Sequence, residues 1–295
     1  MKKMTLLLVM ACLALGSVQA QLLWKIEGKD LSAPSYVIGT HHLIPLQFKD
    51  SIAGLAQAMT DTRQVYGEVV MSEMMTPAFM QQAQQAGVMT DGTTLQSLLS
   101  AADYQRLGEE LKALLSVDVA MLNVVKPAAV MQTLTMGIYL KEFPGFNPQE
   151  QLDGYFQREA VAEGKKVGGL ETPAGQLEVL FGSQSLQRQA ELLVCTLNNL
   201  SRTVDQAKRL NAAYRKQDLE ALLRLMEERE NNSCDPRPEE WNVLIDDRNK
   251  AWMVQLPAVM RQAPTLFAVG AGHLPGKNGL LNLLKQAGYR VTAVR

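Results

Sequence analysis

The pattern that most restricts the fold of this chain is an alternation of short apolar runs with long helical stretches. Four runs are short, rich in β-branched residues and bounded by glycine, which favours strands over turns of a buried helix. They are residues 36–39, 64–67, 166–170 and 265–270, and a weaker alternating run, 289–294, closes the chain. The helical patterns between them are 52–59, 77–85, 94–115, 119–141, 174–200, 202–230 and 239–261, with a kink expected at Pro127 and a turn at Gln217-Asp218.

Strands that are separated by helices imply parallel pairing, and strands that are apolar throughout imply a sheet covered on both faces. The sequence therefore predicts an α/β fold, a helix-rich single domain around a central, partly parallel β-sheet covered by helices. The clearest loop, 231–238, is too short for a linker between domains.

The first twenty residues have the features of an export signal. Lys2 and Lys3 precede a short apolar stretch, 5–16, and small residues stand just before Gln21. We therefore expect residues 1–20 to be removed, residues 21–295 to form the mature domain, and that domain to be periplasmic or secreted without stable insertion in a membrane. A lipoprotein is the less favoured alternative, because the residues before Cys12 only loosely resemble a lipobox.

The charge balance argues against nucleic acid as a partner. Of 29 basic residues two lie in the signal, against 30 acidic residues, and no basic tract is concentrated anywhere. The sequence does not indicate an oligomeric state.

Two cysteines, Cys195 and Cys234, remain after Cys12 leaves with the signal. In an oxidising compartment they favour a disulfide, which would close a loop of roughly 40 residues and add about 3 to 4 kcal/mol of stability through loop entropy. Two buried free thiols are the alternative.

All three histidines of the chain fall in two copies of one motif, Gly-x-x-His, each at the end of an expected strand. A glycine there lets the backbone turn and approach a ligand, and the carboxyl ends of strands are where open α/β sheets bind ligands. We therefore expect Gly39 and Gly270 to serve the geometry of the site, and His42 and His273 to contribute to it. His41 is interpreted as a neighbour that points the other way.

Two glutamates follow apolar runs in the same manner. Glu68 continues a strand, where burial would cost several kcal/mol unless a cation or hydrogen-bond donors meet the carboxylate. The alternative for Glu68 is a buried ion pair with Arg248. Glu171 ends the third run, and its alternative is an ordinary helix-start acid that interacts with the helix dipole.

If the sheet brings these strand ends together, His42, His273 and Glu68 form a mixed nitrogen and oxygen set suited to a divalent metal ion such as Mn, Co or Zn. Such a cation acidifies bound water and polarises a carbonyl, which is the chemistry of amide or ester hydrolysis. One carboxylate of Glu68 and Glu171 could instead serve as general base.

Two segments, YVIGTHH (36–42) and VGAGHL (269–274), resemble the paired Gly-x-x-His motifs of the TraB/GumN/Tiki family, with His42 and His273 at the motif positions. Further matches follow in order along nearly the whole mature chain: Glu68, Lys126-Pro127, Leu152-Asp153, 169–172 with Gln176, and 247–249 before Trp252. The departure is His41, where the family more often has an aliphatic residue.

The resemblance implies a metal-dependent catalytic core. Proteolysis of secreted signalling proteins is described for the animal Tiki branch, and shutdown of a peptide pheromone is linked to TraB. It also favours a functional role for Arg248 and Asn249. A guanidinium at the site could stabilise an oxyanion or hold a substrate carboxylate, whereas spacing alone equally allows an arginine paired with a nearby acid.

The first hypothesis is therefore an exported metal-dependent hydrolase that acts on a peptide or protein substrate. The alternative is a non-catalytic periplasmic binding protein for metal, haem or a peptide. An open coordination position beside a carboxylate would favour the enzyme, and a shell closed by protein groups would favour the binding protein.

Overall fold

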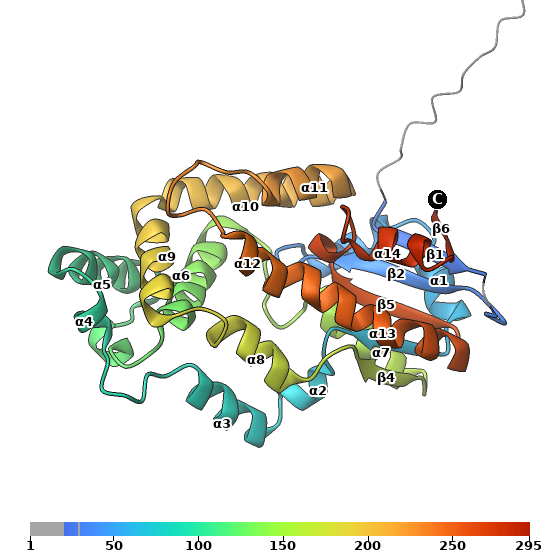
Figure 1. Ribbon diagram of the computed structural model, residues 1–295, viewed down its shortest axis with the longest axis horizontal. Coiled ribbons are helices and arrows are strands. Elements are labelled where there is room, and N and C mark those ends of the chain that lie inside the picture. The colour runs from blue at the N-terminus through green and yellow to red at the C-terminus, as the bar shows by residue number, and fades with distance from the viewer. Residues whose placement is uncertain (1–20, 29) are drawn as a thin grey trace, which may run out of the picture.

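A six-stranded mixed sheet lies at one end of the computed structural model, which describes residues 21–28 and 30–295 (Figure 1). The strand order is β4-β3-β5-β2-β1-β6, and the four strands β4, β3, β5 and β2 are parallel to one another, while β1 pairs antiparallel with β2 and β6. The bounds are β1 Leu23–Glu27, β2 Ser35–Thr40, β3 Gln64–Gly67, β4 Lys166–Gly169, β5 Thr265–Gly270 and β6 Arg290–Ala293. The α/β fold with a partly parallel sheet is confirmed.

All five runs expected to be strands are strands, but β1 has no counterpart among them. Its sequence, LWKIE, includes two charged residues, and only two of its five residues are buried. The apolar signal of β1 is therefore too weak to stand out from sequence alone.

The helices next to the sheet cover its main core. They are α1 Leu55–Asp61, α7 Leu152–Ala162, α13 Asp247–Gln262 and α14 Leu280–Gln286, with the 3-10 turns η1 Leu46–Ser51 and η4 Ala271–His273. Phe156 of α7 and Trp252 of α13 are fully buried in one cluster with Phe267 of β5. Burial of each such side chain contributes about 1.5 to 3 kcal/mol.

The remaining helical elements are α2 Met71–Met74, α3 Pro77–Ala86, α4 Leu95–Leu98, α5 Ala101–Leu115, η2 Val119–Leu122, α6 Pro127–Glu142, α8 Pro173–Phe181, α9 Leu186–Asn198, α10 Leu200–Arg215, α11 Leu219–Met226, α12 Pro238–Trp241 and the π-helical turn η3 Asn242–Asp246. α11 and the end of α10 pack in the main core with the sheet. α4, α5, α6 and α9 form a second body at the end of the molecule away from the sheet (Figure 1). Leu111 of α5, Leu134 of α6 and Leu193 of α9 are fully buried in a separate core. That residues 21–295 form one domain stays a prediction.

Three helix boundaries differ from expectation or sharpen it. Pro127 does not kink a helix but begins α6, because a proline at the first helical position has no amide hydrogen that needs a partner. Ser100 caps α5 and separates it from α4, accepting a hydrogen bond from the amide of Asp103. The expected turn between α10 and α11 is confirmed: Gln217 has a φ of 57° and Asp218 caps α11.

The expected signal peptide lies outside the described residues. Within the described part of the chain, no helix is both long and apolar enough to cross a membrane.

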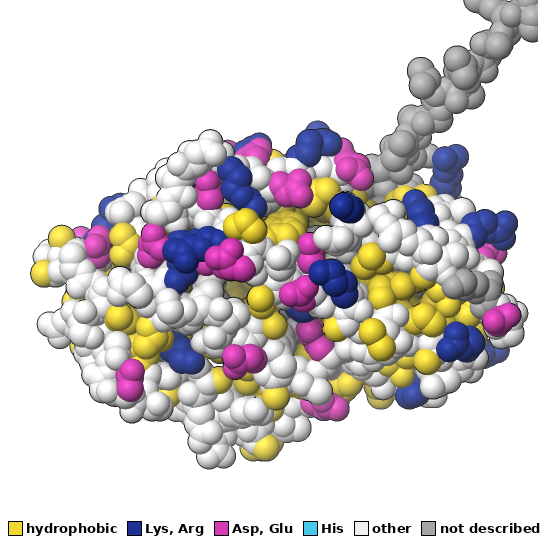
Figure 2. Space-filling view, in the orientation of Figure 1, with side chains coloured by type: hydrophobic (Ala, Val, Ile, Leu, Met, Phe, Trp, Pro, Cys, Tyr) yellow, Lys and Arg dark blue, Asp and Glu magenta, His cyan; other side chains and the backbone are white. Residues whose placement is uncertain are grey.

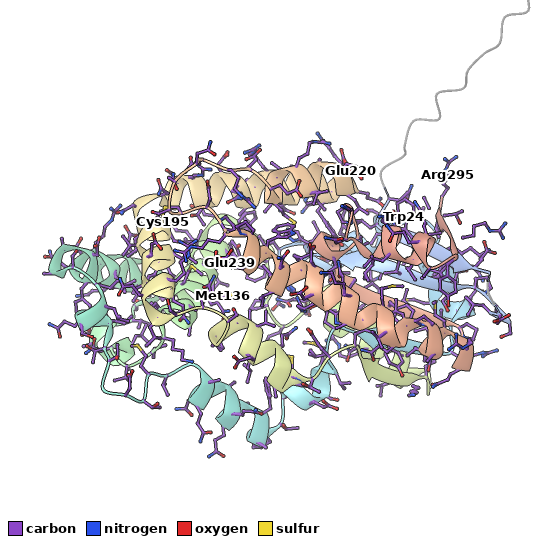
Figure 3. All side chains as sticks on the ribbon, in the orientation of Figure 1. Trp24, Met136, Cys195, Glu220, Glu239 and Arg295 are labelled. Carbon is purple, nitrogen blue, oxygen red and sulfur yellow. A yellow bond between two sulfur atoms is a disulfide. The ribbon has the colours of Figure 1, made fainter. Side chains whose placement is uncertain are left out.

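The disulfide between Cys195 of α9 and Cys234 is present, which confirms that pairing (Figure 3 labels Cys195). A second attachment lies beside it. The guanidinium of Arg188, 5% exposed, donates to both carboxylate oxygens of Glu240 and to the carbonyls of Ser233 and Asp235. These contacts fix the loop before α12 to α9.

We predict that loss of this disulfide lowers the free energy of unfolding by about 3 to 4 kcal/mol, because the unfolded chain regains the entropy of a 39-residue separation. Urea unfolding of the mature protein with and without reductant measures the loss. A Cys195→Ala/Cys234→Ala variant is the control, and its midpoint should not respond to reductant. Two thiols labelled in denatured, unreduced protein would contradict the pairing.

Candidate functional site

The carboxyl ends of the parallel strands meet at one edge of the sheet. The register pairs Thr40 of β2 with Gly270 of β5, and Gly67 of β3 with both Ala268 of β5 and Gly169 of β4. The segments that follow these strands line a cavity of about 570 Å³, which we call the site cavity. Its walls include His42, Gly67, Glu68, Asp153, Gln157, Gln176, Arg248, Gly270 and His273.

Arg248 of α13 joins the charged groups of this edge, and its side chain is 10% exposed. Its Nε donates to Glu171 (3.1 Å), and its Nη2 donates to Glu171 and to Glu68 (2.5 Å each). Its Nη1 donates to the carbonyl of Leu244 (3.1 Å) and lies 3.0 Å from Nε2 of His273. A guanidinium has five N–H groups, so these contacts occupy all of them.

The electrostatics of this arrangement keep Arg248 charged. Burial lowers the pKa of Arg248, but the hydrogen bonds and charges of Glu171 and Glu68 outweigh burial and raise the pKa above its ordinary value. The ion pair between Glu68 and Arg248, which was the alternative interpretation of Glu68, is therefore present, and Glu171 also takes part in it.

Glu68 is held from several sides and is the carboxylate of the pair that lines the cavity. Its Oε1 accepts a hydrogen bond from the backbone amide of Gly270 (2.8 Å), and its Oε2 is approached by Nε2 of Gln176 (3.3 Å). Gln176 also donates to Glu171 (3.1 Å). Several donors thus meet the desolvated carboxylate, as its burial requires.

We expect the two motif glycines to be needed because neighbouring atoms lie close to them, and not because their backbone angles are unusual. A Cβ on Gly270 would lie 3.2 Å from Oε1 of Glu68, and a Cβ on Gly39 would lie 3.0 Å from both Ala271 and Leu274. The φ of Gly270, −52°, is accessible to any residue. Their importance for the site stays a prediction, but its reason is contact distance.

The protonation of His273 follows from its partners. Nδ2 of Asn249 donates to the carbonyls of His273 (3.1 Å) and Asn278 (2.9 Å), which fixes the orientation of the amide. Oδ1 of Asn249 must then accept a hydrogen bond from Nδ1 of His273 (2.8 Å). Nε2 of His273 therefore carries a lone pair and accepts a hydrogen bond from Nη1 of Arg248. Burial, with a further contribution from the charge of Arg248, lowers the pKa of His273 to about 4.

His42 is held differently. Its Nδ1 lies 3.5 Å from Oδ2 of Asp153, whose Oδ1 accepts from the hydroxyl of Thr40 (2.7 Å). The hydrogen bond to Asp153 raises the pKa of His42, although solvent weakens the pair because the side chain of His42 is 68% exposed. Burial raises the pKa of Asp153, but its bonds with His42 and Thr40 outweigh burial and lower it.

His41 does not line the site cavity. Its ring packs against Tyr214 with centroids 5.1 Å apart, and burial lowers its pKa to about 4. This placement agrees with its interpretation as a neighbour that points the other way.

The three expected metal ligands line the same cavity but do not converge. Nε2 of His273 lies 3.9 Å from Oε1 of Glu68 and is hydrogen-bonded to Arg248, while His42 pairs with Asp153. Among the described residues, no group of three His, Cys, Asp or Glu side chains is arranged to hold a metal ion. The metal centre therefore stays a prediction.

The donor chemistry nevertheless suits a metal. Asp153 faces Nδ1 of His42 and Asn249 faces Nδ1 of His273, so Nε2 of each ring is the nitrogen that could bind a metal. Ligating histidines in proteins almost always have such a carboxylate or carbonyl partner on the other nitrogen.

Sequence reasoning assigned no role to two groups of the site. Asp153 stands at the start of α7, where an acid has an ordinary explanation in the helix dipole. Gln157, one turn further along α7, accepts from the amide of Met71 and donates to the carbonyl of Val69 (2.8 Å). Only the match of Leu152-Asp153 to the family pattern could have singled out Asp153, and no feature of the sequence pointed to Gln157.

Comparison with known proteins gives one match: a family model described as the TraB/PrgY/gumN family matches residues 22–293. No curated protein and no solved structure matches the chain.

We predict that His273 makes the fold sensitive to acid. Because its folded pKa is about 4, below the value of about 6.5 in the unfolded chain, its contribution is complete above pH 6.5 and is lost as pH falls toward 4. Between pH 7 and 4.5 the wild type should therefore lose about 2 kcal/mol more than His273→Gln in urea unfolding. Parallel stability curves for the two proteins would show that His273 is not held neutral.

Proposed function

The chain belongs to the TraB/PrgY/gumN family, and on this basis we propose that it is an exported, divalent-metal-dependent hydrolase that acts on peptide or amide bonds. The observation that carries the proposal is the gathering of two histidines and a desolvated carboxylate, His42, His273 and Glu68, at one cavity beside the carboxyl ends of the parallel strands.

His42, His273 and Glu68 are the residues proposed to hold the metal, which we expect to be Mn, Co or Zn. When bound, such a cation would acidify a water molecule and polarise the carbonyl of the substrate. Binding at His273 requires Nη1 of Arg248 to leave Nε2, because the two atoms are hydrogen-bonded.

The carboxylates of Glu68 and Glu171 have different roles in this proposal. Glu171 does not line the site cavity, and its oxygens accept from Arg248 and Gln176. It therefore anchors Arg248. This leaves Glu68, which lines the cavity, as the carboxylate of the pair that would hold the metal.

Arg248 and Asn249 act through other residues. All five donors of Arg248 are occupied in this arrangement, and metal binding at His273 would release only the N–H of Nη1 that faces Nε2. The other four donors stay on Glu68, Glu171 and the carbonyl of Leu244. Arg248 holds Glu68 in place, and Asn249 fixes the tautomer of His273. We assign both as positioning residues.

The proposal predicts that the mature protein binds Mn, Co or Zn and cleaves peptides only with the metal present. His42→Ala and His273→Ala should each weaken metal binding at least about 100-fold, and Asp153→Asn, which disturbs only the orientation of His42, by about 10- to 100-fold. Glu68→Gln should abolish cleavage while keeping the shape of the site. Metal binding is measured by calorimetry and cleavage with a peptide library.

His41→Phe is the matched control, since it changes a histidine of the same motif that packs on Tyr214 outside the cavity. Circular dichroism checks that each variant folds. Full metal affinity in both His42→Ala and His273→Ala contradicts the shared site. Metal or peptide binding without turnover supports the binding-protein alternative.

Export is supported by the disulfide, because such bonds persist in oxidising compartments. We predict that a fractionated host cell holds the protein in its periplasm or medium, and that Edman sequencing finds Gln21 as the first residue. Lys2→Glu/Lys3→Glu should slow export. A protein that keeps residues 1–20 and stays with the cytoplasmic fraction contradicts this part of the proposal.

A further inference from the structure

A second, mostly apolar groove of about 380 Å³ adjoins the site cavity. Val179, Leu180, Met226 and Leu244 line both spaces. We define the apolar groove by these four residues together with Trp241 and Val243. Figure 2 shows hydrophobic side chains gathered between α10 and α11 on one side and α12 on the other.

Two walls of the apolar groove are connected to the charged residues of the site cavity. On α8, Leu180 lies four residues after Gln176, whose amide contacts both Glu68 and Glu171, so both side chains fall on one helix face. On the opposite wall, the carbonyl of Leu244 accepts from Arg248. The π-helical turn η3 that carries Leu244 is a feature often found at functional sites.

The chemistry of the groove favours uncharged apolar groups. Leu180 and Leu244 are 39% and 44% exposed, although they are large hydrophobic residues, so a ligand that covers them gains from their burial. Among the described residues that line the groove, Glu240 is the charged one, and Arg188 already binds both of its oxygens (2.7 and 3.1 Å). A charged group in the groove would therefore find no free partner.

Polar amides along the same groove distinguish between two apolar occupants. Gln132 and Gln184 also line it, and their side-chain amides can hydrogen-bond the main chain of a peptide. A saturated acyl chain would cover these amides without offering partners. The lining thus fits a peptide better than a lipid chain.

We propose that the apolar groove is a subsite that holds large apolar side chains of a peptide substrate, next to the bond that is cleaved in the site cavity. The inference rests on the proposed function, because it takes the bound peptide to be a substrate. Binding of an apolar peptide in the groove can nevertheless be measured without turnover.

The test uses the mature protein with a chelator present, and two blocked hexapeptides, one with two adjacent leucines and one with two adjacent aspartates at the same positions. The leucine peptide should bind at least about 100-fold more tightly in calorimetry, because the aspartates would be desolvated without partners. Leu180→Gln and Leu244→Gln should each weaken the leucine peptide about 10-fold.

Leu140→Gln on α6 is the matched control, because Leu140 is 50% exposed and lies outside the groove; it should leave binding unchanged. Equal binding of the two peptides overturns the subsite, as does unchanged binding in both groove variants. Tighter binding of N-octanoyl-glycinamide than of the leucine peptide also overturns it, in favour of an acyl chain.

Cleavage assays with Mn, Co or Zn separate the subsite from the proposed function. If the leucine peptide binds through Leu180 and Leu244 but is never cleaved, the subsite stands and the hydrolase proposal fails. If cleavage occurs with equal efficiency for both peptides and in both variants, the hydrolase proposal stands and the subsite fails.

Discussion

The guanidinium of Arg248 is the interaction on which the candidate site depends. Two carboxylates, Glu68 and Glu171, lie at the buried ends of neighbouring strands, where their mutual repulsion and desolvation would be costly without a cation. Arg248 supplies that cation, and all five of its N–H groups form contacts at the site. The positions of Glu68 and of Nε2 of His273 are therefore linked through one side chain.

The position of Arg248 is in turn prepared by contacts outside the site. It stands on α13, directly after η3 and α12, and the loop before α12 is held to α9 by the disulfide and by Arg188. The second helical core thus contributes to the site, because α9 belongs to that core. It also supplies much of the apolar groove, since Met131 of α6 and Leu192 of α9 line it. The site consequently lies where the sheet and the helical body meet.

Much of this architecture could be predicted locally. Short glycine-bounded runs indicate the parallel strands, and the carboxyl ends of such strands necessarily share an edge, which is enough to place Gly39, Glu68 and Gly270 near one another. β1 was not predicted as a strand because two charged residues weaken its apolar pattern. Asp153 was not predicted as a site residue because an acid at a helix start has an ordinary local explanation, and its role arises only from its contact with His42.

The sequence by itself determined the fold class, favoured the cysteine pairing and singled out the two Gly-x-x-His motifs with Glu68 and Glu171 at the strand ends, because each depends on short-range patterns or on residue chemistry. Only the tertiary structure decided which of these residues contact one another. His42 and His273 lie in equivalent motifs, yet one is exposed and held by Asp153, while the other is buried, neutral and held by Asn249 and Arg248. That difference arises from two helices, α7 and α13, whose packing against the sheet supplies a carboxylate to one ring and an amide to the other.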